Sequence, residues 1–209
     1  MTGPDKDGVV AGMNEDLAVV VLAGGEGRRM GGGKPLRVLD GATLLEHALA
    51  RARGWSRSVA IAVREAGQAG DVDARLILDH PAIGGPAAGL ASAFAFAREQ
   101  GASRLLTVPC DAPRLPADLP IRLAAALTGD VGCAVAASLG RLHPTCALWR
   151  VEMAQRLPAY LEQRASLRGF AEACGMAVVD WDAGPEDDPF ANVNTPEDLA
   201  ALEAGHRAS

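Results

Sequence analysis

A glycine-rich segment that follows a run of valines is the part of this sequence best suited to chemistry. The thirteen residues from Ala23 to Pro35 contain six glycines, two adjacent arginines (Arg28 and Arg29) and Lys34. Glycines let backbone N–H groups approach a phosphate closely, and cations neutralise its charge. Because three like charges in one loop repel one another unless an anion binds, the segment predicts a triphosphate site. A tight turn without a ligand is the alternative.

Two common phosphate motifs do not fit this segment. The P-loop pattern requires a glycine where this chain has Arg28, and a hydroxyl residue where it has Pro35. The dinucleotide pattern GxGxxG requires a glycine where this chain has Met30. The sequence therefore indicates neither a P-loop ATPase nor a standard NAD site.

An aspartate at the end of a second apolar run could complete such a site. Asp111 follows the run "RLLTV" and lies between Pro109 and Pro113, which stiffen its backbone. A lone aspartate in a loop is usually a turn residue or a helix cap. Opposite a triphosphate loop, however, a fixed carboxylate can bind Mg²⁺ while the phosphates supply its other ligands. We therefore predict Mg²⁺ as cofactor and Asp111 as its ligand.

Alternating strands and helices are expected to position these groups. Apolar runs predict strands over 17–23, 58–63, 76–78, 104–108, 133–137, 146–149 and 176–181. Helical spacing predicts helices over 43–53, 90–100, 116–127, 151–164 and 167–174, a loop at "HPAIGGPAAG", and a last helix with Thr195 as N-cap. This order is typical of an α/β fold with a mostly parallel sheet covered on both faces. In such sheets ligands bind beyond the carboxyl ends of the strands, so the glycine loop and Asp111 should face one crevice.

The composition of the chain excludes several classes of protein. The chain has 209 residues, 49% of them hydrophobic and 22% charged, and a net charge of −6, which argues against nucleic-acid binding. No apolar stretch is long enough to span a bilayer, so no membrane association is expected. The four cysteines match no zinc or CxxC spacing and are expected to be buried thiols of a cytoplasmic protein. Residues 1–16 are interpreted as a disordered leader rather than a signal peptide, and residues 17–209 as a single domain.

Four motifs together resemble a known family. In order along residues 17–202 they are "LAGGEGRRMGGGKPL", "VPCDAPRLP", "RLHPTCALW" and "FANVNTPEDL". They resemble the molybdenum cofactor guanylyltransferases, although the first motif is shared with sugar-phosphate nucleotidyltransferases. The resemblance implies a Rossmann-like three-layer fold and transfer of GMP from GTP to the terminal phosphate of molybdenum–molybdopterin, with release of pyrophosphate. It also implies possible partners among molybdenum-insertion and molybdoenzyme maturation proteins.

The resemblance assigns roles residue by residue. Catalysis would rest on Lys34, Arg28 and Asp111, because the attacking phosphate is already an anion and mainly needs positioning and charge stabilisation. "GPAAG" at Gly85–Gly89 matches a second loop of the active cleft. The residues expected at the nucleotide are Leu22, Ala23, Gly24, Gly25, Lys34, Asp79 and Asp111, and those expected at the pterin are Asn192, Asn194 and His143.

Three of these residues have an alternative interpretation, and the sequence departs from the family pattern at two further places. His143 could instead be a hydrogen-bonded turn residue before Pro144. Asn192 and Asn194 lie on one face of an extended segment, which favours a shared binding role over bracing the turn. The family often has aspartate at the position of Gly33, and guanylyltransferases can carry asparagine near the base where this chain has Ala60-Ile61-Ala62.

Three other functions remain open from the sequence. A cytidylyltransferase of the same cofactor and a sugar-phosphate nucleotidyltransferase would use the same loop chemistry. A noncatalytic GTP-binding module would bind nucleotide without releasing pyrophosphate. Asp111 argues against this last function, because a pure sensor needs no metal at the α-phosphate.

Overall fold

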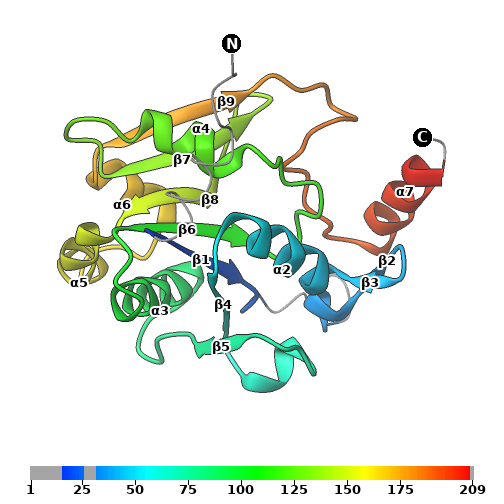
Figure 1. Cartoon of the computed structure of the whole chain (residues 1–209), viewed down its shortest axis with the longest axis horizontal. Helices are drawn as coiled ribbons and strands as arrows, with labels where there is room; N and C mark the ends of the chain where they lie inside the picture. The colour runs from blue at the N-terminus through cyan, green and yellow to red at the C-terminus, as the bar shows by residue number, and fades with distance from the viewer. Residues whose placement is uncertain (1–15, 26–31, 208–209) are drawn as a thin grey trace, which may run out of the picture.

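A seven-stranded sheet forms the centre of the molecule, as the computed structural model shows for residues 16–25 and 32–207 (Figure 1). The strands run in the order β5-β4-β1-β6-β8-β7-β9. Only β8 is antiparallel to its neighbours among the pairings of this described sheet, and the others are parallel. The bounds are β1 Leu17–Leu22, β4 Ser58–Val63, β5 Arg75–Leu78, β6 Arg104–Pro109, β7 Cys133–Ser138, β8 Arg141–Arg150 and β9 Met176–Trp181.

Helices cover both faces of this sheet, which confirms the predicted three-layer α/β class (Figure 1). The α-helices of the described chain are α2 Leu44–Trp55, α3 Pro86–Glu99, α4 Leu119–Ala126, α5 Leu157–Leu161, α6 Leu167–Ala173 and α7 Pro196–Arg207. Short 3-10 helices and a small hairpin complete the described chain: η2 Lys34–Leu36, η3 Ala66–Ala69, η4 Val151–Arg156, β2 Val38–Leu39 and β3 Ala42–Thr43. Within the described part, no helix is long and apolar enough to cross a membrane.

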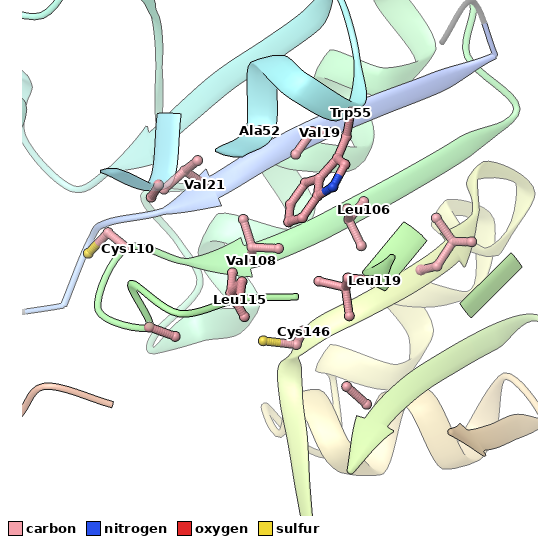
Figure 2. Close-up of a cluster of buried hydrophobic side chains, with 14 of the residues drawn as sticks. Val19, Val21, Ala52, Trp55, Leu106, Val108, Cys110, Leu115, Leu119 and Cys146 are labelled. Atoms are coloured by element: carbon pink, nitrogen blue, oxygen red, sulfur yellow. The ribbon is translucent and has the colours of Figure 1, made fainter. Parts of the chain in front are cut away.

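The core lies in two layers because successive side chains of a strand point to opposite faces. Val19 and Val21 of β1 pack on the side of α2 and α4, whereas Ala18 and Val20 pack against α3 on the other face. Figure 2 shows the first layer, with Trp55 of α2 lying over these valines and their neighbours on β6. Each fully buried aliphatic side chain contributes about 1.5–3 kcal/mol relative to exposure. The two layers therefore hold the ends of β1 and β6 rigidly side by side.

The predicted loop "HPAIGGPAAG" is wrong at its carboxyl end. Helix α3 begins inside it, at Pro86, rather than at Leu90. Gly85 is the N-cap with φ 66°, a left-handed value that a residue with a Cβ adopts only with strain. Proline is suited to the first helical position because its missing N–H would have no helical partner there. "GPAAG" is therefore the first turn of a helix and not a loop.

Several other predicted boundaries also need correction. Strand β8 begins at Arg141 instead of 146, because the hairpin turn before it lets pairing with β7 start at once. The helix predicted over 151–164 is divided into η4 and α5, and it ends at Leu161. The helix predicted from 116 begins at Leu119, since Pro116 lies in irregular chain and Ala117 and Asp118 form a turn.

The described chain includes one residue that the sequence assigned to the leader. Asp16, which the sequence placed in the leader, accepts hydrogen bonds from the Ser103 backbone N (2.9 Å) and hydroxyl (2.6 Å). Its carboxylate also lies 3.3 Å from Arg104 Nε, and these partners lower its pKa although partial burial opposes them. Asp16 thus joins β1 to the start of β6. The prediction for residues 1–15 lies outside the described residues.

Candidate active site

The order of the strands places a cleft at the end of β1. From β1 the chain moves outward through β4 to β5, and α3 then returns it to β6 on the opposite side of β1. Ligands of open α/β sheets bind where the strand order reverses in this way. A cleft of about 650 Å³ lies there. It is lined by the predicted positions Leu22, Ala23, Gly24, Gly25, Lys34, Asp79, Asp111, Asn192 and Asn194.

Three of these side chains, from segments far apart in sequence, meet in one network. Lys34 Nζ lies 2.5 Å from Asp111 Oδ2 and 2.9 Å from Asn194 Oδ1. The side chains of Lys34 and Asp111 are 12% and 17% exposed, so both charges are largely removed from water. The predicted nucleotide lysine, metal ligand and pterin residue are therefore in direct contact.

The backbone around Lys34 explains how a loop cation is fixed. Gly33 adopts φ 62° and caps η2, and its carbonyl accepts a hydrogen bond of 2.9 Å from Leu36 N. Pro35 is buried beneath this turn. Glycine adopts the left-handed conformation without steric cost, and aspartate is one of the few other residues that tolerate it. The departure at Gly33 therefore preserves the turn that directs Lys34 into the cleft.

Asp111 is held by backbone hydrogen bonds on both sides. Cys110 N donates to Leu22 O at the end of β1 (3.2 Å), and Val193 N donates to Asp111 O (2.8 Å). Asp111 Oδ1 is buried without a hydrogen-bond partner among the described residues. A buried carboxylate oxygen without a donor is a good ligand for a hard cation. In the described part of the chain no group of three or more acidic, histidine or cysteine side chains could hold a metal.

Asp79 lies against two glycines of the cleft. A Cβ on Gly24 would collide with Asp79 Oδ2, and one on Gly89 would lie 3.2 Å from Asp79 Oδ1. A side chain at Gly24 would therefore force the Asp79 carboxylate to move, and one at Gly89 would need a shift of a few tenths of an ångström. Burial raises the pKa of Asp79, while the nearby Arg64 guanidinium opposes that shift. Asp79 Oδ1 also has no hydrogen-bond partner among the described residues, so it can accept one from a ligand.

The amino terminus of α3 forms another wall of the cleft. Gly85, Pro86 and Gly89 line it. The first N–H groups of a helix have no internal partner, and the helix dipole adds positive potential there. This wall therefore favours an anionic ligand, in agreement with the predicted role of "GPAAG".

The carboxyl-terminal asparagines occupy the remaining side. Asn192 and Asn194 both line the cleft. Capping of α7 is carried out by other residues: Thr195 Oγ1 accepts from Asp198 N (3.1 Å), and Asp198 Oδ2 accepts from Thr195 N (2.9 Å). Thr195 is thus the N-cap that the sequence predicted. The Asn194 side chain is directed to Lys34 rather than to the helix, which favours a binding role over bracing the turn.

His143 lies in strand β8, so the alternative interpretation as a turn residue is wrong. Among the described residues, those lining the cleft do not include His143. Its Nε2 lies 2.8 Å from Ser138 Oγ, and its ring stacks on Phe190 at 4.8 Å. Burial lowers its pKa, with Asp188 opposing and Arg141 adding to the shift. Direct contact with a second substrate stays a prediction.

Two polar side chains that line the cleft, those of Arg64 and Thr145, were not predicted as site residues. Arg64 follows β4 directly, so the strand-end rule applied to Asp111 could have found it. Thr145 projects from an irregular stretch of β8 next to Pro144, where the pairing register with β7 shifts. Proline cannot donate a ladder hydrogen bond, and this was the available signal.

Two further predictions concern the catalytic role of Arg28 and the chemical state of the cysteines. The predicted catalytic residue Arg28 lies outside the described residues. The four cysteines are free, buried thiols, as expected. Burial raises the pKa of Cys110 to about 12, and the neighbouring Asp111 charge adds to the shift. Cys110 is therefore a packing residue and not a nucleophile, despite its position at the end of β6.

The chain is similar to several known proteins. The family model of the MobA-like NTP transferase domain matches residues 19–178. Two relatives named molybdenum cofactor guanylyltransferase, from Acidiphilium cryptum (strain JF-5) and Rhodobacter capsulatus, are 41% and 42% identical. Each alignment covers 90% of this chain and 95% of the relative. The crystal structure of molybdopterin-guanine dinucleotide biosynthesis protein A from Archaeoglobus fulgidus has a TM-score of 0.73 at 22% identity, covering 92% of this chain and 100% of that one.

Proposed function

The chain belongs to the MobA-like NTP transferase family, and from this membership we propose that it is a molybdenum cofactor guanylyltransferase. It transfers GMP from GTP to the terminal phosphate of molybdenum–molybdopterin and releases pyrophosphate. The observation that carries the proposal is the meeting of Lys34, Asp111 and Asn194 in one cleft. This network brings together a lysine that would bind the nucleotide, a carboxylate that would bind the metal, and an amide that would bind the pterin substrate.

The nucleotide half of the reaction uses the edge of the sheet. Gly24 and Gly25 let the triphosphate lie close to the backbone after β1, and the first turn of α3 attracts its negative charge. Lys34 is a compact, mobile cation that can follow the α- and β-phosphates as charge develops on the leaving pyrophosphate. Asp79, whose Oδ1 has no hydrogen-bond partner among the described residues, would accept hydrogen bonds from the nucleotide.

The acceptor half uses the carboxyl-terminal side of the cleft. Asn192 and Asn194 would hold the pterin substrate so that an oxygen of its phosphate faces the α-phosphorus of GTP. The new P–O bond forms as the bond from the α-phosphorus to the β-phosphate oxygen breaks. The attacking oxygen is already anionic, so no side chain has to remove a proton, and positioning provides most of the acceleration.

We propose Mg²⁺ as the cofactor, held by Asp111. The buried Oδ1 of this residue, which has no donor among the described residues, fits a hard cation. When bound, Mg²⁺ would neutralise the phosphates and increase the electrophilicity of the α-phosphorus. We also propose a cytoplasmic location, where the four buried thiols stay reduced, and exchange of the cofactor with molybdenum-insertion and molybdoenzyme maturation proteins.

The proposal is tested by pyrophosphate release with Mg²⁺ and the molybdenum-loaded pterin, with GTP, CTP and ATP compared. Guanine presents N1–H and N2–H₂ donors to acceptors such as Asp79, whereas cytosine presents a different edge. We expect kcat/KM to favour GTP by about 10²-fold or more, because the wrong base leaves buried polar groups unpaired. A preference for CTP would make the protein a cytidylyltransferase. Binding of GTP without release of pyrophosphate would make it a binding module.

A further inference from the structure

The segment that carries the two cleft asparagines is attached at three points. We call residues 188–194 the asparagine segment. At its end, Asn194 contacts Lys34, and its backbone N donates to Asp198 Oδ2 (2.8 Å). One residue before this end, the Val193 backbone N donates a hydrogen bond to Asp111 O (2.8 Å). Its beginning, at Asp188 and Phe190, is attached to strands β7 and β8 instead of to the cleft.

The attachment at the beginning of the segment is a chain of hydrogen bonds that passes through Ser138. Ser138 is fully buried, and its hydroxyl lies 2.7 Å from Asp188 Oδ1 and 2.8 Å from His143 Nε2. Asp188 Oδ1 also accepts a hydrogen bond of 3.0 Å from Phe190 N. An ionised carboxylate only accepts, so Ser138 must use its single proton for Asp188. His143 must then donate from Nε2 to the serine oxygen, which fixes the protonation of that nitrogen.

Stacked rings strengthen the same attachment. Phe190 is 2% exposed and lies between His143, stacked at 4.8 Å, and Trp181, edge-on at 5.1 Å. The Arg122 guanidinium of α4 lies over the Trp181 ring, 4.0 Å from its centroid. Phe190 stands two residues before Asn192, so a displacement of this ring would also displace the Asn192 backbone at the cleft.

We propose that His143 is a positioning residue that acts through Ser138, Asp188 and Phe190 to hold Asn192 and Asn194 in place for the acceptor substrate. This inference rests on the proposed function for the identity of that substrate. It gives the histidine–proline motif a role that needs no contact with a ligand. The nucleotide side of the cleft, built on β1, β4 and α3, does not depend on this chain of contacts.

Four substitutions separate the parts of this network. His143→Phe keeps a stacking ring and removes the donor, while Ser138→Ala removes the link. Asp188→Ala removes the acceptor, whereas Asp188→Asn keeps an acceptor oxygen and should restore most of the function. Asp187→Ala is the matched control, since Asp187 is exposed in the same loop.

Two measurements are made on each variant. For His143→Phe, Ser138→Ala and Asp188→Ala we expect KM for the loaded pterin to rise by ~10–100-fold, because small displacements of positioning groups have effects of this size. The affinity for GTP should stay within about twofold of wild type, well below the tenfold that 1.4 kcal/mol represents. Hydrogen–deuterium exchange without substrates should show faster exchange in residues 188–194, including the Val193 amide. Asp188→Asn and Asp187→Ala should resemble wild type in both measurements.

Other outcomes would overturn the inference. If only His143→Phe raises KM and the asparagine segment exchanges at the wild-type rate, His143 contacts the substrate directly. If all variants lose affinity for both substrates in proportion to a lower melting temperature, the network is merely structural. Failure of the proposed function is distinguishable, because wild type itself would then show no transfer while the exchange measurement still tests the attachment.

Discussion

Replacing Lys34 by methionine should make the nucleotide-free protein bind a divalent cation more tightly. The Lys34 ammonium lies 2.5 Å from Asp111 Oδ2, and so it holds the carboxylate that we propose as the Mg²⁺ ligand. A divalent ion without nucleotide must displace this cation or share the carboxylate with it. Methionine keeps an unbranched side chain of similar length and removes the competing charge.

The magnitude follows from the geometry and exposure of the pair. Two unit charges about 4 Å apart interact by ~4 kcal/mol at an effective dielectric constant of about 20. With exposures of 12% and 17% the pair is not completely dry, so part of this energy is lost to solvent. A net effect of about 1–2 kcal/mol corresponds to a metal affinity ~5–30-fold higher in the variant.

The assay is titration of the nucleotide-free protein with Mn²⁺, followed by the paramagnetic resonance signal of the free ion. The double variant Lys34→Met/Asp111→Asn is the control, and it should lose the gain because the charged ligand is gone. Equal or weaker Mn²⁺ binding by Lys34→Met would refute the reasoning and indicate that Lys34 does not compete with the metal. Turnover of the variant should fall in any case, because the phosphates lose a cation.

The other predictions also compare matched substitutions. Asp111→Asn should lower kcat by on the order of 10²–10⁴-fold with an unchanged fold, while Asp118→Asn, at an exposed position nearby, should be silent in steady-state assays. Gly24→Ala should raise KM for GTP because its Cβ meets Asp79 and should cost about 1–3 kcal/mol of stability, whereas Gly25→Ala, whose Cβ meets nothing within 4 Å, should melt like wild type. Burial raises the pKa of Asp79 above its usual 3.8, so its ionisation destabilises the fold as pH rises through the raised pKa. Asp79→Asn should therefore have a higher Tm than wild type at pH 7, and this difference should shrink as pH falls below 3.8, where Asp79 is protonated in the folded and the unfolded chain alike.

The sheet and the nucleotide side of the cleft could be predicted because local patterns determine them. Buried apolar runs predicted β4 and β9 with their observed bounds, and the rule for strand ends predicted that the glycine loop and Asp111 share a crevice. Those patterns act within a few residues, and the topology then brings parallel strand ends together. The first turn of α3 was missed because proline and glycine signal a helix start and a loop alike.

Strand β8 could not be predicted in full because its sequence contains a proline. The register passes from the Val135–Ala147 pair to the Ala136–His143 pair, so residues 144–146 stand outside the ladder with β7. A bulge of this kind depends on the partner strand, which no local pattern reveals. It is also the reason that Thr145 projects into the cleft, and that His143 contacts β7 and the asparagine segment instead.

The position of Asn194 depends on contacts that are more distant still. Asp111 is separated from Lys34 by 77 positions and Asn194 by 160, yet only Asp111 stands at the end of a strand. Asn194 reaches Lys34 because Val193 is fully buried in a small separate core formed by residues of the β2–β3 hairpin, α2 and α7: Leu39, Leu44, Val193 and Leu202. The proposed nucleotide side of the cleft is thus fixed by the sheet, whereas the proposed acceptor side depends on this small core and, by our inference, on the His143 network. Substitutions in those two clusters should therefore affect the acceptor substrate before they affect GTP.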